Sequence, residues 1–356
     1  MNSRRQKLAL CLGSVVFCLL VGEVAARVLL PHPFVSKMEP NDGKTPRNGE
    51  ALRSLHRADP KLGWVLNPGP LEYEHRFVDE HGSVQYDAVY SIENGQRRTS
   101  LTPHPGPVIV AAGCSFTFGH AVRDEDTWPW LLQDQLPDYR VLNTGDMGYG
   151  TDQALLAAEK QVLSAPGKTD AVVLGLGDFQ IDRNRGAQGW LVFVSPFAKP
   201  LFKMTADGAE YDRQVHFWSP GFVGDHSALF AHLTNTLANR VYGITSHAGA
   251  RQLTAALITT FARKFQSMGV GFAVVVLPYA DDQGPQSKAD RAFLIDRLSA
   301  AHIPVFIPDF PRLPDGHFDV EKFMVNKKER HPNRQYNLIL ANQLKPFLQS
   351  AGIITK

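Results

Sequence analysis

The sequence predicts an α/β protein built on a five-stranded, mainly parallel sheet flanked by helices in a three-layer arrangement. Five short apolar runs have the length of buried strands, and they begin near Val108, Val141, Val172, Phe272 and Val305. Segments with helical apolar spacing stand between or after them, at about 152–163, 251–268, 288–301 and 334–350. Strands that alternate with helices and are apolar on both sides are typical of parallel sheets.

Composition places the chain among globular proteins and excludes some functions. Of its 356 residues, 44% are hydrophobic and 20% are charged, which suffices for one large domain and an accessory segment. The net charge is only +2 and the body of the chain has no basic run, so a nucleic-acid partner is not expected. No glycine-rich phosphate loop or metal-ligand spacing is evident, and we therefore expect no cofactor and no metal.

Residues 1–34 form a membrane-targeting segment. Three basic residues precede an uncharged apolar run at 8–22, whose 15 residues would suit a cleaved signal peptide. A helix over 8–30 would reach ~34 Å at 1.5 Å per residue, enough to span a membrane. We favour an uncleaved anchor in the inner membrane with the catalytic domain in the periplasm, because the basic flank stays in the cytoplasm. Cleavage after Ala26 is the alternative.

Residues 35–104 precede the main domain, which is predicted at 105–352. Their first part, to about residue 60, is polar and rich in Pro, Asn, Gly and Lys, as linkers are. The rest resembles short strands and turns, which indicates a small β-rich extension packed on the main domain. The extension is either purely structural or places Trp64 or Arg97 along the substrate cleft.

The alternation of strands and helices breaks between about 186 and 246. We interpret this stretch as a lid-like insertion near the active-site face, because long insertions often form lids or binding loops. Its aromatic residues would either stack on sugar rings, line an acyl pocket or form a small core of their own; they are Trp190, Phe193, Phe197, Trp218 and Phe222.

Candidate chemistry gathers at two distant places. Ser115 stands just past the first predicted strand, where ligands bind in open α/β sheets. Glu329 and His331 stand ahead of the last predicted helix. A serine hydroxyl needs a base to take its proton, and a histidine held by an acid is the usual base.

Three blocks of the chain resemble the SGNH hydrolase (GDSL-type esterase/lipase) family, in its membrane-anchored bacterial type. Gly113-Cys114-Ser115 is similar to the family's Gly-Asp-Ser block, with Cys in place of Asp. The stretch 143–150, NTGDMGYG, carries Gly148 in the family's second glycine position. Glu329-Arg330-His331 is similar to the Asp-x-His block, with Glu in place of Asp. The resemblance covers roughly residues 108–348.

The resemblance implies a role for each matching residue. Ser115 would be the nucleophile and His331 its base, and the N–H groups of Ser115 and Gly148 would be oxyanion donors. Glu329 would hold His331 as the triad acid, or else it is a surface charge beside its basic neighbours.

The family's third block, Gly-x-Asn-Asp, has no counterpart with an Asn side chain at the end of the third strand. Gly177 and Phe179 occupy the corresponding positions, and neither side chain can donate a hydrogen bond. The nearest candidates for the missing oxyanion and substrate-binding donor are Asn184 and Gln180. Alternatively, Asn184 caps or turns the loop after that strand.

These observations favour a serine esterase that works through an acyl-enzyme on Ser115. Its expected substrates are O-acyl groups, most plausibly acetyl, on an envelope or exported polysaccharide, and the inner membrane is its expected partner through residues 8–30. One alternative is a polysaccharide O-acetyltransferase with the same acyl-enzyme. Another is a lipase. A third, from a different class, is a non-catalytic polysaccharide-binding or assembly protein on a degenerate hydrolase fold.

Overall fold

A computed structural model describes most of the chain. The described residues are 3–29, 55–78, 83–165, 167–186, 190–191, 194, 197–216, 226–241, 246–279, 284–327 and 329–355. The predicted linker lies outside them up to residue 54, as do Phe193, Trp218 and Phe222 of the insertion.

The predicted parallel sheet is present. Its strands are β6 (Val108–Ala112), β7 (Arg140–Asn143), β8 (Thr169–Leu176), β11 (Gly271–Val276) and β12 (Val305–Phe306). Neighbours pair in parallel in the order β12-β11-β8-β6-β7. In this order β6 lies between the second and third strands in sequence, so the crevice at the carboxyl ends of β6 and β8 is the switch point where α/β proteins bind ligands.

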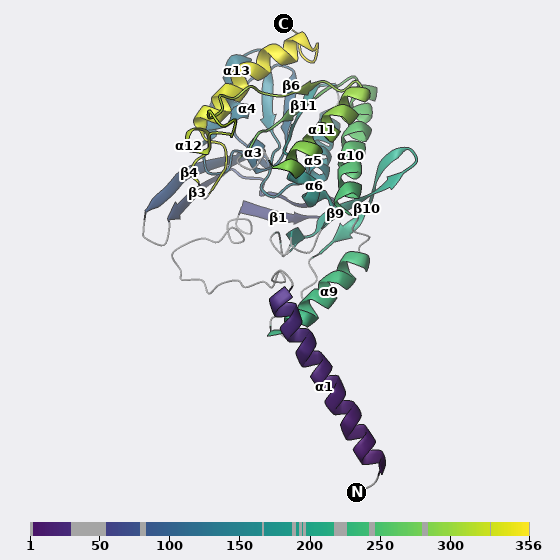
Figure 1. Cartoon of the computed structure of the whole chain (residues 1–356). Helices are drawn as coiled ribbons and strands as arrows, with labels where there is room; N and C mark the ends of the chain where they lie inside the picture. Colours follow the sequence, from purple (N-terminus) through teal and green to yellow (C-terminus); the bar gives the residue numbers. More distant parts are fainter. Residues whose placement is uncertain are drawn as a thin grey trace.

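Helices cover both faces of this sheet (Figure 1). On one face lie α4 (Trp128–Gln135) and α13 (Arg334–Ser350), and on the other lie α5 (Thr151–Ser164), α10 (His247–Ser267) and α11 (Pro285–Ala300). Successive strand residues serve opposite cores, because side chains alternate across a strand. Ile109 and Ala111 pack with α4 and α13, whereas Val108 and Val110 pack with α5 and α10.

The β-rich extension joins the sheet itself. Strands β3 (Leu71–Val78), β4 (Val84–Glu93) and β5 (Gln96–Arg97) run antiparallel to one another and continue it beyond β7, giving eight strands in all among the described residues. The junction is a single pairing of Arg97 with Asn143. A second hairpin, β1 (His56–Asp59) with β2 (Gly63–Leu66), forms a separate two-stranded sheet. The expected packed extension is therefore part of the main sheet.

The short helix α6 (Gln180–Asn184) lies just ahead of the insertion, which holds the hairpin β9 (Lys199–Thr205) and β10 (Gly208–Val215) and the helix α9 (Ala228–Val241). The hairpin packs on α10, where Phe202 meets Phe261 edge to face. Leu191, Leu201 and Val215 form a small core of their own. Of the predicted aromatic set, Phe197 is buried and Trp190 is half-buried.

Helix α1 (Ser3–Leu29) extends away from the domain and meets α9 near its C-terminal end (Figure 1). Its residues Gln6–Leu29 form a helix long and apolar enough to cross a membrane. Three short helical turns complete the described fold: α3 (Ser115–Phe118), the 3₁₀ turn η1 (Asp124–Asp126) and α12 (Val320–Phe323).

Candidate active site

Ser115 begins α3, directly after β6. The turn requires close packing, because a Cβ on Gly113 would stand 2.1 Å from Oγ1 of Thr117. Ser115 is 6% exposed. Among the described residues its N–H has no hydrogen-bond partner, and the first bonded N–H groups of α3 are those of Thr117 and Phe118, which donate to the carbonyl of Cys114. The serine therefore combines a hydroxyl with a free backbone donor at the switch point of the sheet.

His331 reaches Ser115 from the loop ahead of α13. Its Nε2 lies 2.9 Å from Oγ of Ser115. The loop is held by Asn333, whose Oδ1 caps α13 by accepting from the N–H of Tyr336 and whose Nδ2 donates to two carbonyls of the α12 segment. The carbonyl of His331 also accepts from the N–H of Val325 at 2.9 Å. The histidine is thus fixed by the chain on both sides.

Glu329 holds the other ring nitrogen. Its Oε1 lies 2.8 Å from Nδ1 of His331. Arg330, between them, adopts a left-handed backbone conformation with φ of 54°. This turn brings two side chains two residues apart to the same side. Glu329 therefore lies in a Ser–His–Glu arrangement rather than standing as a lone surface charge.

A second histidine, His120, contacts the same carboxylate. Its Nε2 lies 3.0 Å from Oε1 of Glu329, and its Nδ1 lies 3.3 Å from the hydroxyl of Tyr90. The Tyr90 oxygen accepts from the N–H of Ala121 at 2.9 Å, which leaves its O–H to donate to Nδ1 of His120. A neutral His120 with its proton on Nε2 satisfies every one of these contacts.

The charges of this cluster follow from burial and pairing. Burial lowers the pKa of His120 to about 4, although the hydrogen bond to Glu329 opposes that shift. Burial raises the pKa of Glu329, but hydrogen bonds from His120 and His331 outweigh it and hold that pKa well below its usual range. Burial also lowers the pKa of His75, which neighbours His120. Near neutral pH the cluster therefore holds a carboxylate beside a neutral His120.

The cluster also has the spacing of a metal site. His120, Glu329 and His331 each offer one ligand atom, and these atoms lie within 4.8 Å of one another. The sequence predicts no such group, because the fold assembles it from segments two hundred residues apart. The ligand atoms already take part in the hydrogen bonds described above, and these account for their proximity.

The second glycine turn follows β7 and is joined to the turn before Ser115 by a hydrogen bond of 3.2 Å from the N–H of Asp146 to the carbonyl of Gly113. Gly148 has φ of +80°, a conformation that favours glycine. A Cβ there would lie 3.2 Å from the ring of Trp64 and 3.5 Å from that of Trp190. Its neighbours Met147 and Tyr149 have bonded N–H groups, whereas the N–H of Gly148 has no partner within the described residues. It is a second free backbone donor.

The two side chains predicted as further donors differ in their contacts. Nδ2 of Asn184 donates to Oγ1 of Thr254 at 2.8 Å, and its Oδ1 accepts from the N–H of Asp152. Asn184 therefore ties α6 to α10 and α5, a role in the scaffold that differs from the predicted capping or turning of its own loop. Oε1 of Gln180 accepts from the N–H of Gly177 at 2.8 Å, but its buried Nε2 has no partner in the described part of the chain.

Arg183 was not among the predicted site residues. Its guanidinium lies over the rings of both Phe179 and Trp190, at 4.7 and 4.5 Å from their centroids. It also donates to the carbonyl of Tyr149 at 3.0 Å. Arg183 therefore connects α6 and the half-buried Trp190 with the glycine turn.

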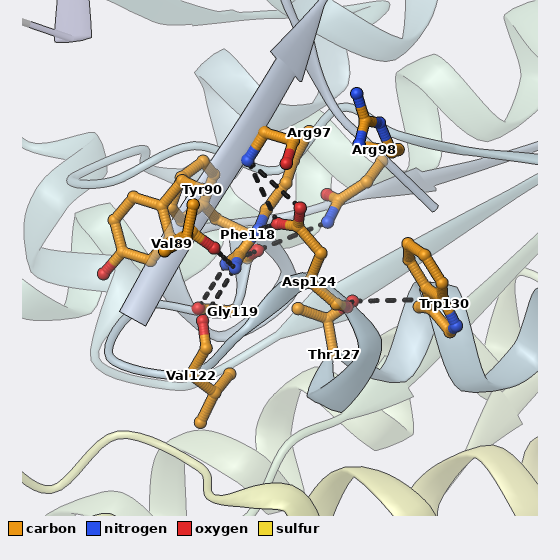
Figure 2. A network of polar contacts seen from close by, with 12 residues as sticks. Val89, Tyr90, Arg97, Arg98, Phe118, Gly119, Val122, Asp124, Thr127 and Trp130 are labelled. Carbon is orange, nitrogen blue, oxygen red and sulfur yellow. Dashed lines mark hydrogen bonds and ion pairs between the residues drawn. The ribbon is translucent and has the colours of Figure 1, made fainter. Parts of the chain in front are cut away.

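The β-rich extension donates hydrogen bonds to the loops that carry the site. Arg97 is fully buried and donates to the carboxylate of Asp124 at 2.7 Å and to carbonyls of the loop after Ser115, including that of Val122 at 2.7 Å (Figure 2). Trp64 donates from Nε1 to the carbonyl of Met147 at 3.1 Å. Both residues are buried, so they support the loops of the site rather than line an open cleft.

Sequence reasoning missed His120, Tyr90 and Arg183. A signal existed for His120, which follows Ser115 by five residues and ends the FTFGH stretch. Tyr90 carries no local signal, because it reaches the site only through the antiparallel strands of the extension. Arg183 lies in the IDRN stretch one residue before Asn184, and only the turn of α6 separates their directions.

The fold and the site together define an α/β protein with a Ser–His–Glu arrangement at the switch point of a parallel sheet. Several solved structures are similar to this chain. A member of the lipolytic protein G-D-S-L family from Veillonella parvula is 13% identical, with 68% of this chain and 100% of that chain covered and a TM-score of 0.40. A GDSL-like lipase from Bacteroides thetaiotaomicron is 13% identical, with 70% and 93% covered and a TM-score of 0.39.

A third similar structure is the esterase EstA from Pseudoalteromonas, determined with monoethylphosphonate as inhibitor. It is 13% identical, with 68% of this chain and 97% of that chain covered and a TM-score of 0.39. No protein-family model and no curated protein matches the chain.

Proposed function

We propose that this protein is a membrane-anchored serine esterase that cleaves acyl esters through an acyl-enzyme on Ser115. The observation that carries the proposal is the 2.9 Å contact between Oγ of Ser115 and Nε2 of His331, with Glu329 on the opposite ring nitrogen. This is the arrangement in which a histidine can remove the serine proton and an acid can hold the resulting imidazolium.

The reaction would proceed in two displacements. Oγ of Ser115 attacks the ester carbonyl while its proton passes to Nε2 of His331, and the oxygen of the tetrahedral intermediate becomes negative. That oxygen accepts from the free N–H groups of Ser115 and Gly148. His331 then gives its proton to the departing alcohol. A water molecule repeats the sequence on the acyl group, returns the proton to Ser115 and releases the carboxylic acid.

The substrate class follows from the surroundings of the site. Half-buried Trp190 stacks on Arg183 beside the glycine turn, and aromatic faces of this kind suit sugar rings. Helix α1 would hold the domain at the inner membrane, on the periplasmic side. We therefore propose small O-acyl groups, acetyl first, on an envelope or exported polysaccharide as the substrate.

Labelling with a fluorophosphonate tests the proposal directly, because the probe reacts only with an activated serine. The full-length protein in detergent is expected to take up the probe at Ser115, with no label in Ser115→Ala and strongly reduced label in His331→Ala. Ser287→Ala, at a half-buried serine, is the matched control and should label normally. An unlabelled wild-type protein that is folded by circular dichroism would favour the non-catalytic polysaccharide-binding alternative.

If the serine labels, release of acetate from an acetylated polysaccharide separates hydrolysis from transfer. Acetate release in water without an added acceptor supports the esterase. Release only when a second polysaccharide is present, with acetyl appearing on it, would instead show an O-acetyltransferase.

A further inference from the structure

Helix α9 presents an apolar stripe to the outside of the protein. Phe230, Leu233 and Leu237 are 39%, 60% and 56% exposed. They recur at intervals of three and four residues, which places them on one face of a helix. Such a face on a soluble domain normally packs against a core, so its exposure calls for an occupant.

The N-terminus of α9 is bound to α1. The carboxylate of Glu23 accepts from Oγ of Ser227 at 2.8 Å and from the N–H groups of Ala228 and Leu229 at 2.9 and 3.0 Å. A negative charge is favoured there, because the first N–H groups of a helix point at it. Arg27 adds a hydrogen bond to the carbonyl of His226 at 2.8 Å. Glu23 also accepts from Nε of Arg27 at 2.7 Å, so α9 adds hydrogen-bond partners to an ion pair that already forms within α1.

The contact also covers the potential cleavage site. Ala26, the last residue of the Val-Ala-Ala stretch, is only 3% exposed. Gly22 permits this approach, since a Cβ there would lie 3.0 Å from Leu229. Removal of the residues up to Ala26 would delete Glu23 and leave the first turn of α9 without its partner.

The position of this contact along α1 indicates where α9 would lie relative to a bilayer that α1 spans. Glu23 stands six residues before Leu29, or about 9 Å along the helix axis at 1.5 Å per residue. Around it α1 is apolar and open, with Leu20, Val21 and Val24 all more than half exposed. If α1 spans the bilayer, α9 begins within the boundary between headgroups and acyl chains, where amphipathic helices lie.

We propose that α9 is an interfacial helix whose Phe230–Leu233–Leu237 stripe rests in the outer boundary of the same bilayer that α1 spans, and that α1 is retained as its partner. The inference rests on the proposed membrane location. The bilayer is the favoured occupant because α9 begins in contact with α1, whose surface around that contact is apolar and exposed. Exposed Arg27 and Arg240 flank it with charge that suits anionic headgroups.

Photocrosslinking tests this in the full-length chain, reconstituted into vesicles of phosphatidylethanolamine and phosphatidylglycerol with labelled acyl chains. The photoreactive amino acid p-benzoylphenylalanine is placed singly at Leu233, at Leu237, at Leu20 of α1 and at Leu101, which is 79% exposed on the domain. We expect lipid adducts at Leu20, Leu233 and Leu237 and none at Leu101.

Each of the other outcomes would refute one part of the proposal. Lipid adducts at Leu20 but not at Leu233 or Leu237 would refute the interfacial helix while leaving the anchor intact. A crosslinked protein dimer through Leu233 in place of lipid would show that a second copy covers the stripe. No lipid adduct at Leu20 would refute the membrane location itself. N-terminal sequencing that begins at Arg27 would refute retention of α1.

A variant that removes the charge of Glu23 tests whether the contact with α1 positions the apolar stripe of α9. Glu23→Ala removes the acceptor for the first turn of α9, and we expect the lipid adduct at Leu233 to fall severalfold while that at Leu20 is unchanged. Glu125→Ala, at an exposed acid of η1, should leave both adducts unchanged. An unchanged yield at Leu233 in Glu23→Ala would show that the contact with α1 does not place α9.

Discussion

The two sides of Ser115 are built differently. On the acid side, one carboxylate oxygen is shared by two histidines, and the second histidine is held in turn by Tyr90 of the extension. On the oxyanion side, two free backbone N–H groups stand near side chains that mostly serve the scaffold, Asn184 above all. If the proposed esterase mechanism holds, side chains would fix the base, and the two backbone N–H groups would be the best-defined donors to the developing charge.

The largest effect should come from the acid side. Glu329→Gln keeps the shape of the side chain but removes the charge that holds Nδ1–H of His331, and loss of the orienting acid costs about 10⁴ in kcat. We expect a loss of about that size for hydrolysis of p-nitrophenyl acetate. Glu321→Gln, at an exposed glutamate paired with Lys327, is the matched control. More than a tenth of the wild-type rate in Glu329→Gln would make the site a Ser–His dyad.

The next effect tests whether the oxyanion side has any side-chain donor at all. Gln180 is the candidate, because its buried Nε2 has no partner among the described residues. Gln180→Glu retains an oxygen for the N–H of Gly177 and removes the donor. Loss of one oxyanion donor costs about 10²–10³ in kcat, and we expect the lower end of that range. A kcat within threefold of wild type would leave the hole with backbone donors only.

His120 should have a smaller effect. His120→Phe removes one hydrogen bond to Glu329, and a bond to a charged group contributes about 1.5–3 kcal/mol, or roughly 10–100-fold if fully expressed in the transition state. We expect that loss in kcat with KM unchanged. His120→Gln restores an N–H donor and should recover most of it. If both variants fall equally, His120 acts through packing and does not position the acid.

The five parallel strands could be predicted because each is a local apolar run, and Ser115 and His331 because each stands in a local motif. The eight-stranded sheet could not, because a single distant pairing, Arg97 with Asn143, joins the extension. Likewise, no local pattern indicates that Tyr90 reaches His120. The sequence favours Asn184 over Gln180 as the donor, and only the turn of α6 and the position of α10 show that the amide of Asn184 has other partners.

The pH dependence of folding stability tests the protonation state of His120 without an activity measurement. The pKa of His120 falls from its ordinary value near 6.5 to about 4 in the folded protein, so between these values the unfolded chain binds more protons. Stability should therefore fall as pH drops from 6.5 to 4, by up to about 3 kcal/mol from this residue. In His120→Phe, the free energy of unfolding measured with denaturant should change less between pH 6.5 and pH 4 than in wild type. Equal slopes would show that His120 is protonated in the fold.

The smallest effect on turnover is expected at Asn184, on the opposite side. Its Nδ2 and Oδ1 are both taken, by Thr254 and by the N–H of Asp152, and the residue is 1% exposed. Asn184→Ala would strand two buried partners, which costs about 1–3 kcal/mol each at most. Because these partners lie on α10 and α5, the loss should appear in the denaturant midpoint.

The kinetic half of this prediction decides between the two donors. Provided that the denaturant curve shows Asn184→Ala to be folded at 25 °C, its kcat should lie within threefold of the wild-type value. The kcat of Gln180→Glu should be about a hundredfold lower than that of wild type. Thr254→Val removes the hydrogen bond to α10 but keeps the one to Asp152, so it should show a smaller stability loss and the same rate. A hundredfold drop in Asn184→Ala alone would mean that its amide turns toward the substrate when one binds. In that case the oxyanion side, like the acid side, would depend on a side chain.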